Sequence, residues 1–320
     1  MPNTSAPRDR VALGIGLIVL SCLLTAAQDA IFKHASASLT LWQVYVLRSV
    51  FLIPALLIVA SFWGGQAAMR QSLTLWPLMR ALCFVVMYFS MYTAIPFVPL
   101  SVIAAGLYTS PLFIAALSAP LLGERVGARG WLAIAVGFAG VLLILQPGSE
   151  AFTWLAVLPV IGGLAYAIAA IITRSRLRQT PPPALALALG MMLLGIGIVG
   201  TAAIGLWQPA TETASILPFL FSAWGPVGLG VLAFIGALAA LMVTNGLVLP
   251  AAYQMAPSVI IATFDYCYLI FASLLGFIFF GEVPGLLTVV GMLMIAGAGL
   301  MISLSPAPHL HRTAASDAAQ

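Results

Sequence analysis

The sequence predicts an all-α polytopic membrane protein with ten transmembrane helices, arranged as two inverted five-helix repeats. Composition, the length of the apolar segments and an internal repeat predict this fold. Hydrophobic residues make up 62% of the 320 positions and charged residues only 6%, and the mean hydropathy is +1.14. A soluble domain carries roughly a quarter charged residues. This chain lacks the polar residues that would cover a water-facing surface, whereas a bilayer accommodates spans of about 20 apolar residues.

Apolar segments separated by proline, glycine and charged residues predict the individual helices. Residues 11–148 contain the first five: Val11–Lys33, Leu41–Phe62, Trp76–Ile95, Leu100–Leu122 and Arg129–Gln146. Residues 152–304 contain the second five: Phe152–Thr173, Ala184–Trp207, Pro226–Leu249, Ser258–Phe280 and Gly285–Leu304. The first segment is interpreted as a retained helix, because its apolar run exceeds a signal-peptide core. Residues 1–10 and 305–320 are expected to be cytoplasmic ends.

An internal repeat relates the two halves. Aligning the Gly-Glu pair at 123–124 with the pair at 281–282 superposes further positions without a gap: Ala94 on Ala252, Pro99 on Pro257 and Tyr108 on Tyr266. Chance matches of single apolar residues are common in such a chain, but a matching series of proline, tyrosine and Gly-Glu is not. Because each half holds an odd number of helices, the halves insert with opposite topology, which is a recurring plan of secondary transporters.

Lysine and arginine gather on one side of the predicted fold. With the N-terminus inside, ten of the twelve basic residues lie on the cytoplasmic side: Arg8, Arg10, Arg70, Arg80, Arg125, Arg129, Arg174, Arg176, Arg178 and Arg312. This asymmetry predicts that both termini are cytoplasmic. The cluster at 174–178 would face anionic lipid. The net charge of +4 therefore requires no nucleic-acid partner.

Two blocks of the chain resemble the EamA repeat of the drug/metabolite transporter superfamily. The matching positions of the first block are Tyr108-Thr-Ser-Pro-Leu, Gly123-Glu-Arg, Gly137 and Gly140. Those of the second are Tyr266, Gly281-Glu282, Gly291, Gly297 and Gly299. The resemblance implies EamA repeats at 11–148 and 152–304, a bacterial inner-membrane location, cytoplasmic termini and alternating access through a central cavity.

Charged residues within the spans are similar to those of a subgroup that includes riboflavin and S-adenosylmethionine uptake proteins. The positions that carry this similarity are Asp29-Ala-Ile-Phe-Lys33, Arg48, Arg80 and Asp265-Tyr266. The similarity implies that the cargo is a small metabolite.

Asp265 is the sharpest candidate for a functional residue. It lies eight residues beyond Pro257, which is about 12 Å along a helix and near mid-depth. An ionisable group there costs about 2.5–3.5 kcal/mol on insertion scales. One interpretation is a substrate or proton site, aided by Tyr266 and Tyr268; the other is a carboxyl that hydrogen-bonds between helices. Its repeat counterpart is Leu107, so the fold does not require the charge.

Asp29 and Arg48 form a second candidate group. Both are expected in the outer half of the membrane, where they could pair across a short hairpin. Lys33 is four residues from Asp29 and could compete for it, while Gln28 is expected on another helix face. A buried structural ion pair and a role in substrate binding or gating remain open, because loss of either partner would be damaging in both cases.

The tyrosines and the two Gly-Glu carboxylates complete the candidates. Tyr108 and Tyr266 are expected deep in the membrane, and Tyr92 shares one face of its helix with Tyr88. Such aromatic residues suit a planar ligand, although they also serve as packing. Glu124 and Glu282 are interpreted as structural helix ends that accept hydrogen bonds from N–H groups at the start of the next helix.

The sequence argues against enzymes and channels. The histidines (His34, His309 and His311) lie at an outer helix end or in the tail, and the cysteines (Cys22, Cys83 and Cys267) form no CxxC motif. No catalytic residue, metal site or cofactor is therefore expected. No ring of charges or filter motif indicates a channel, and no Walker A loop indicates ATP as the direct energy source.

A secondary transporter of a small organic metabolite is the predicted function. Few, nearly balanced core charges and many aromatic residues suit a near-neutral or zwitterionic aromatic cargo. Uptake of a vitamin such as riboflavin is the leading hypothesis; S-adenosylmethionine uptake and amino-acid or drug export are the alternatives. Membrane lipid is an expected partner, protons are a candidate coupling ion, and a homodimer is a candidate assembly.

Overall fold

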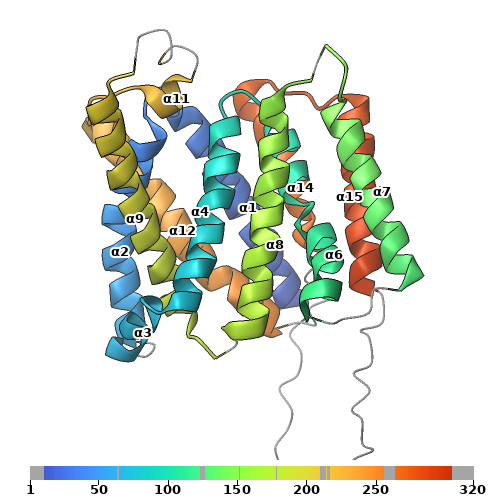
Figure 1. The fold of residues 1–320 in the computed structure, drawn as a ribbon, viewed down its shortest axis with the longest axis horizontal. Coiled ribbons are helices and arrows are strands. Elements are labelled where there is room, and N and C mark those ends of the chain that lie inside the picture. The colour runs from blue at the N-terminus through green and yellow to red at the C-terminus, as the bar shows by residue number, and fades with distance from the viewer. Residues whose placement is uncertain are drawn as a thin grey trace, which may run out of the picture.

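The computed structural model describes residues 11–62, 65–122, 127–150, 152–177, 179–209, 214, 217–255 and 264–304. Helices dominate these residues, and no strand occurs among them (Figure 1). The first half contains α1 (Val11–Ala35), α2 (Leu41–Phe62), α3 (Gly65–Ser72), α4 (Leu75–Ala94), α5 (Leu100–Leu107), α6 (Ser110–Leu122) and α7 (Ala128–Leu145). The second contains η1 (Trp154–Val157), α8 (Leu158–Arg176), α9 (Pro182–Trp207), α11 (Pro218–Phe221), α12 (Leu229–Met255), α14 (Cys267–Phe280) and α15 (Leu286–Leu304).

The predicted all-α membrane fold is confirmed. Eight helical segments of the described chain are long and apolar enough to cross a membrane, with α5 and the start of α6 forming one of them. Two shorter apolar helices, Cys267–Phe280 and Leu286–Met301, account for the ninth and tenth predicted spans. Exposed leucine, isoleucine and phenylalanine side chains cover the outer faces of these helices. Such a surface suits lipid, because apolar patches of this extent are rare on soluble monomers.

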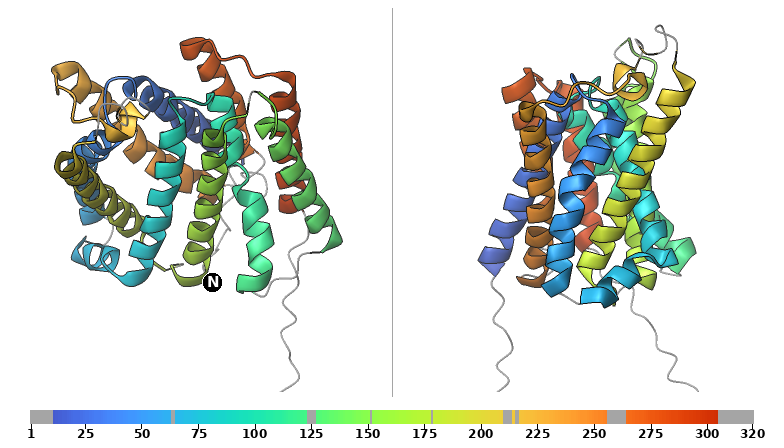
Figure 2. Two further views of the ribbon diagram at one scale, coloured as in Figure 1. Left: turned by 45° about the horizontal axis from the view of Figure 1, so that its top comes forward. Right: turned by 90° about the vertical axis from the view of Figure 1, so that its left-hand side faces the viewer.

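The two halves interlock. The helix pairs that pack most extensively are α7 with α15, α4 with α8, α2 with α9, and α1 with α12. Figure 1 and Figure 2 show α7 beside α15 at one end of the bundle and α2 beside α9 at the other. Every one of these pairs joins the first half to the second. Exchanging equivalent helices (α1 for α8, α2 for α9, α4 for α12 and α7 for α15) maps the set onto itself, as a two-fold inverted repeat requires.

The prediction of one continuous helix over Leu100–Leu122 is wrong. The chain leaves the α-helix at Tyr108 and Thr109, and α6 then begins at Ser110. Pro111 explains this break, because it has no N–H to continue the hydrogen-bond ladder and is tolerated only in the first turn of a new helix. The hydroxyl of Thr109 donates to the Gly106 carbonyl at 2.6 Å and so satisfies a carbonyl at the break.

The fourth span of the second half breaks at the equivalent place. Residues 264–265 are helical, Tyr266 forms a turn, and α14 begins at Cys267. The prediction of a continuous Ser258–Phe280 helix is therefore wrong at Tyr266, and residues 256–263 lie outside the described part. Tyr266 is the repeat counterpart of Tyr108, so both halves interrupt the same span at the same aligned residue.

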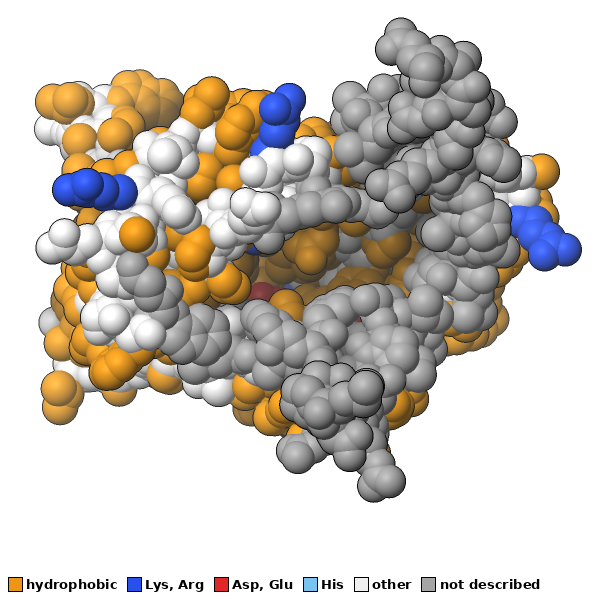
Figure 3. All heavy atoms as spheres, turned by 90° about the horizontal axis from the view of Figure 1, so that it is seen from below, with side chains coloured by type: hydrophobic (Ala, Val, Ile, Leu, Met, Phe, Trp, Pro, Cys, Tyr) orange, Lys and Arg blue, Asp and Glu red, His pale blue; other side chains and the backbone are white. Residues whose placement is uncertain are grey.

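The bundle is packed at one face and hollow at the other. α1 begins and α15 ends at the lower face in Figure 1, which we call the terminal face. Toward the opposite face, the ends of α1, α2, α4 and α5 bury large apolar side chains: Phe32, Leu41, Ile95, Leu100 and Ile103. Figure 3 looks onto the terminal face and shows a hollow in it. The described state is therefore closed toward the opposite face.

Candidate substrate-binding site

A cavity of about 580 Å³ occupies the middle of the bundle. Its volume lies within the range of about 300–1,000 Å³ that is usual for small-molecule sites. The walls come from both halves: α1, α2, α4, α5, α6, α8, α9, α12, residues 265–266 and α14. The lining also includes residues of α2, α6 and α12 that lie toward the terminal face, among them Val59, Ile114 and Leu249. This placement agrees with the hollow in Figure 3.

Four of the six predicted binding or coupling residues line this cavity: Asp29, Tyr108, Asp265 and Tyr266. Arg48 and Tyr92 do not line it. Both are fully buried behind the wall, where the Tyr92 ring stacks on Phe32 with centroids 3.5 Å apart. Tyr92 therefore supports the cavity wall, and its hydroxyl accepts a long hydrogen bond from the Gln28 amide at 3.4 Å.

The break at Tyr266 frees a backbone carbonyl beside the cavity. The Leu269 N–H donates to the Tyr266 carbonyl at 3.1 Å and not to the Asp265 carbonyl, as it would in a continuous α-helix. The Asp265 carbonyl instead accepts hydrogen bonds from two side chains: the Tyr108 hydroxyl at 3.0 Å and the Cys22 thiol at 3.2 Å. Both donors come from the first half. The carbonyl is satisfied without water, as a non-helical segment at membrane depth requires, and the two halves are joined at the cavity wall.

Two carboxyl groups face the cavity at different depths. Asp29 is 2% exposed, and its Oδ2 accepts a hydrogen bond from the Tyr268 hydroxyl at 2.5 Å. The Asp265 carboxyl lies beside Cys22, whose thiol is 3.5 Å from Oδ1. Cys22 is seven residues before Asp29 on α1, so the carboxyls are separated by about 10 Å along the membrane normal. Neither forms an ion pair within the described residues.

The predicted Asp29–Arg48 pair is wrong. Within the described chain Arg48 makes no salt bridge, and its guanidinium is surrounded by aromatic rings. The predicted competition of Lys33 for Asp29 is wrong as well, because Lys33 binds elsewhere. Gln28 was expected to face away from this region, but it lines the cavity. On α2, mostly apolar residues gave no stripe that predicts the direction of Arg48 around the helix axis. On α1, Ser21, Thr25 and Gln28 recur at helical spacing and all line the cavity, which is a signal that the sequence analysis missed.

Tyrosines form much of the cavity wall. Tyr108 stacks on Tyr268 with centroids 5.2 Å apart and lies 5.4 Å from Tyr266. Tyr88 and Tyr166 add further rings from α4 and α8. Tyr166 was missed by the sequence analysis; its position eight residues into α8, near mid-depth, was the available signal. Planar aromatic walls favour a ligand with a flat ring system, since offset stacking adds to the burial of apolar area.

Polar groups other than the carboxyls also reach the cavity. Arg80, which the sequence analysis assigned to the cytoplasmic side, lies in the second turn of α4 and lines the cavity. Its Nε donates to the Thr173 hydroxyl at 2.8 Å, and its guanidinium lies 4.5 Å from the Phe84 ring centroid. On the facing α1–α12 wall, Asn245 binds Ser21 and Thr25 at 2.5 and 2.9 Å.

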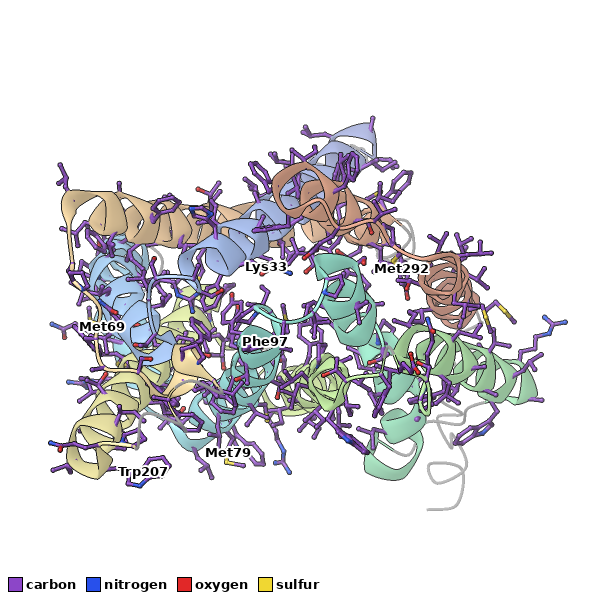
Figure 4. All side chains as sticks on the ribbon, turned by 90° about the horizontal axis from the view of Figure 1, so that it is seen from above. Lys33, Met69, Met79, Phe97, Trp207 and Met292 are labelled. Atoms are coloured by element: carbon purple, nitrogen blue, oxygen red, sulfur yellow. The ribbon has the colours of Figure 1, made fainter. Side chains whose placement is uncertain are left out.

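The packed end above the cavity is held by Glu282. The carboxylate forms an ion pair with Lys33 and accepts a hydrogen bond from the Leu100 backbone N–H at 2.8 Å. Lys33 also donates to the Val98 carbonyl at 2.8 Å. The sequence analysis expected Glu282 to accept hydrogen bonds from the start of the next helix along the chain, which is α15. In the structure it accepts one from the start of α5 instead. Figure 4 looks onto the opposite face and shows Lys33 where the ends of α1, α5 and α14 converge. Glu124 lies outside the described residues.

Metal-binding clusters are absent from the described residues: none of them contains three or more His, Cys, Asp or Glu side chains close enough to hold an ion. The three cysteines are unpaired by disulfides. Within the described part of the chain, the functional geometry is a cavity with aromatic walls and a few separate polar groups, as in many small-molecule binding sites.

Comparison with known proteins identifies the family of this bundle. The profile of the EamA-like transporter family matches residues 12–146. A riboflavin transporter of Rhizobium johnstonii is 30% identical over 296 residues, which cover 89% of this chain and 87% of that protein. The chain belongs to the EamA-like transporter family. This agrees with the predicted drug/metabolite transporter superfamily.

Other relatives of this EamA-type transporter carry different names. An S-adenosylmethionine uptake transporter of Rickettsia bellii is 24% identical, with 92% of this chain and 94% of that protein covered. A pseudopaline exporter of Pseudomonas aeruginosa is 27% identical over 92% of this chain and 97% of that protein. A solved crystal structure with 17% identity covers 90% of this chain and 95% of its own, at a TM-score of 0.57, and supports the fold. The bacterial relatives support the predicted bacterial inner-membrane location.

Proposed function

We propose that this EamA-type transporter takes up a small planar metabolite by alternating access, with riboflavin as the leading cargo. The observation that carries the proposal is the cavity wall, in which Tyr88, Tyr108, Tyr166, Tyr266 and Tyr268 surround one space. A flat heteroaromatic ring fits between such side chains and buries apolar area on both of its faces. The relatives named as riboflavin transporters support the same cargo.

The proposal assigns the terminal face to the cytoplasm. Basic residues gather on that side of the chain, as cytoplasmic segments do under the positive-inside rule. The described state is then open toward the cytoplasm and closed toward the outside. Cargo would enter from the outside when the packed ends of α1, α5 and α14 separate, and it would leave through the hollow on the terminal face.

Asp29 and Asp265 are the proposed coupling groups. Each is a carboxyl group on the cavity wall without a cation in ion-pair distance among the described residues. An uncompensated carboxylate in an apolar interior is unfavourable, and binding a proton relieves that cost. Proton uptake from one side and release to the other would couple cargo movement to the proton gradient. An Asp265→Asn variant with unchanged transport rate and pH dependence would show that Asp265 has no part in proton coupling.

Growth of a riboflavin auxotroph without its own uptake system tests the cargo. Expression of the wild-type chain is expected to restore growth at low external riboflavin, and a Tyr268→Ala variant, which opens the aromatic wall, is expected to restore it poorly. Trp154→Ala changes an exposed aromatic residue that does not line the cavity and serves as the matched control. Wild-type protein that is present in the membrane but restores no growth would overturn riboflavin as the cargo and leave the transporter class intact.

S-adenosylmethionine uptake is the second candidate, and one observation favours it. Arg80 and Asp265 line the same cavity and bear opposite charges, which suits a zwitterion. Uptake of labelled S-adenosylmethionine, measured beside uptake of labelled riboflavin in cells that express the chain, distinguishes the two cargoes. Efflux of a preloaded cargo from the cell, without uptake, would instead support an exporter.

A further inference from the structure

Arg48 is the most unusual buried group in the described chain. Its side chain has no exposed surface, and its Nε, Nη1 and Nη2 atoms make no hydrogen bond of normal geometry with any described residue; the Tyr92 hydroxyl makes only a weak contact with the guanidinium. Seven buried side-chain nitrogen and oxygen atoms of the described residues lack a partner; Arg48 contributes three, and Tyr45 and Ser49 contribute one each. The unsatisfied polar groups are therefore concentrated in one short stretch of α2.

Aromatic rings surround the guanidinium but do not satisfy it. Its Cζ lies 5.6 Å from the Tyr88 ring centroid and 6.0 Å from those of Tyr45 and Tyr92. Such cation–π contacts favour the charge without accepting its N–H groups. A guanidinium carries five N–H donors in one plane, and an arginine in the bilayer is expensive unless it is paired. Among the described residues, this strong donor group thus has no acceptor of normal hydrogen-bond geometry.

The cavity reaches the edge of this cluster. Tyr88 contacts Arg48 and also lines the cavity. Leu52, one helical turn beyond Arg48 on α2, lines the cavity as well. The acidic residue of this region, Asp29, forms no ion pair with the guanidinium, and its Oδ2 accepts the Tyr268 hydroxyl. Tyr88 is thus a side chain that contacts both the guanidinium and the cavity.

We propose that Arg48, behind Tyr88, is a subsite for a pair of coplanar oxygen acceptors on the cargo: a carboxylate, or the two carbonyls of a heteroaromatic imide ring. A guanidinium binds such a pair through two parallel N–H bonds, which a lysine cannot reproduce. The subsite rests on the transporter assignment but not on riboflavin itself. It orients the cargo, with its flat ring against the tyrosines and its oxygen pair toward α2.

Benzoate, an aromatic carboxylate, is a suitable probe for purified protein in nanodiscs. Binding is measured by titration calorimetry at constant ionic strength, with benzamide as the neutral comparison. Wild type is expected to bind benzoate and to bind benzamide much more weakly. Arg48→Gln and Arg48→Lys are each expected to weaken benzoate at least tenfold, because both lose the two-pronged contact. Arg70→Gln, in α3 outside the cavity, is the matched control and should bind like wild type.

The thermal stability of the empty protein separates a ligand site from a structural arginine. Because Arg48 has no hydrogen-bond or ion-pair partner among the described residues, Arg48→Gln should unfold no lower than wild type in the absence of ligand. Benzoate that binds both Arg48 variants as tightly as wild type, or that does not bind wild type, would overturn the proposal. So would an Arg48→Gln protein that unfolds several degrees lower or fails to fold while Arg48→Lys binds normally. A failure of riboflavin rescue alone would refute the cargo and leave this subsite standing.

Discussion

Replacing Glu282 tests how the closed end of the bundle is held. Glu282→Gln keeps the size of the side chain and an oxygen that can accept the Leu100 N–H, but it removes the negative charge. Lys33 then keeps its hydrogen bond to the Val98 carbonyl but loses its ion-pair partner. Breaking a buried pair on one side costs about 3–5 kcal/mol. The Lys33 and Glu282 side chains retain 10% and 17% exposure, so we expect a smaller loss, of about 2–3 kcal/mol.

Two further variants separate the charge from the helix cap. Glu282→Ala also removes the acceptor of the Leu100 N–H at the start of α5; an unsatisfied buried donor adds about 1–3 kcal/mol. Combining Lys33→Gln with Glu282→Gln removes both charges, so no uncompensated ion remains and the loss should be smaller than for Glu282→Gln alone. The expected order of stability is wild type, double variant, Glu282→Gln, then Glu282→Ala.

Tryptophan fluorescence during thermal unfolding in detergent measures this order. Glu150→Gln changes an exposed carboxylate and should shift the midpoint little, because surface substitutions usually stay within about 0.5 kcal/mol. A Glu282→Gln protein that unfolds at the temperature of Glu150→Gln would refute the reasoning. So would a double variant that is less stable than either single variant, because the two charges would then not depend on each other.

Three further predictions concern the cavity and the helix contacts. Tyr268→Phe removes the donor to Asp29 and should slow transport and change its pH dependence without loss of folded protein; unchanged pH profiles in proteoliposomes would contradict this. Cys22 lies in the cavity wall, so maleimide applied from the terminal face of wild-type vesicles should label it and bound cargo should protect it; equal labelling with and without cargo would count against the site. A side chain at Gly140 would lie 2.8 Å from the Gly291 carbonyl, so Gly140→Val should separate α7 from α15 and lower the unfolding midpoint by several degrees, whereas Gly16→Val meets open space and should not.

The depth of a residue could be predicted from the sequence, because rise along a helix depends only on residue number. In the structure both Asp265 and Asp29 line the cavity, and the Asp265 carboxyl lies beside Cys22, seven residues before Asp29 on α1. The direction of a side chain around its helix could not be predicted in the same way. Helices such as α2 are apolar on every face, so no polar stripe indicates which side faces the bundle. This is why Arg48 was paired with Asp29 in the prediction and points into a tyrosine cluster in the structure.

The repeat register predicted more than the helix pattern did. It aligned Tyr108 with Tyr266, and these are the two residues at which the fourth span of each half breaks. The breaks themselves were missed for different reasons. Pro111 was a local signal in the first half, but the second half has Leu269 at that position. There the turn is stabilised by Tyr108 and Cys22, which are distant in sequence and become neighbours only when the halves interlock.

Counterflow in proteoliposomes tests most directly whether the cavity carries riboflavin by alternating access. Vesicles that contain purified protein are loaded with unlabelled riboflavin and diluted into a trace of labelled riboflavin. A carrier that opens to one face at a time exchanges the two pools, so the label should rise inside above its external concentration and then decline. Label that only equilibrates would indicate a channel, and label that does not enter would contradict riboflavin as the cargo.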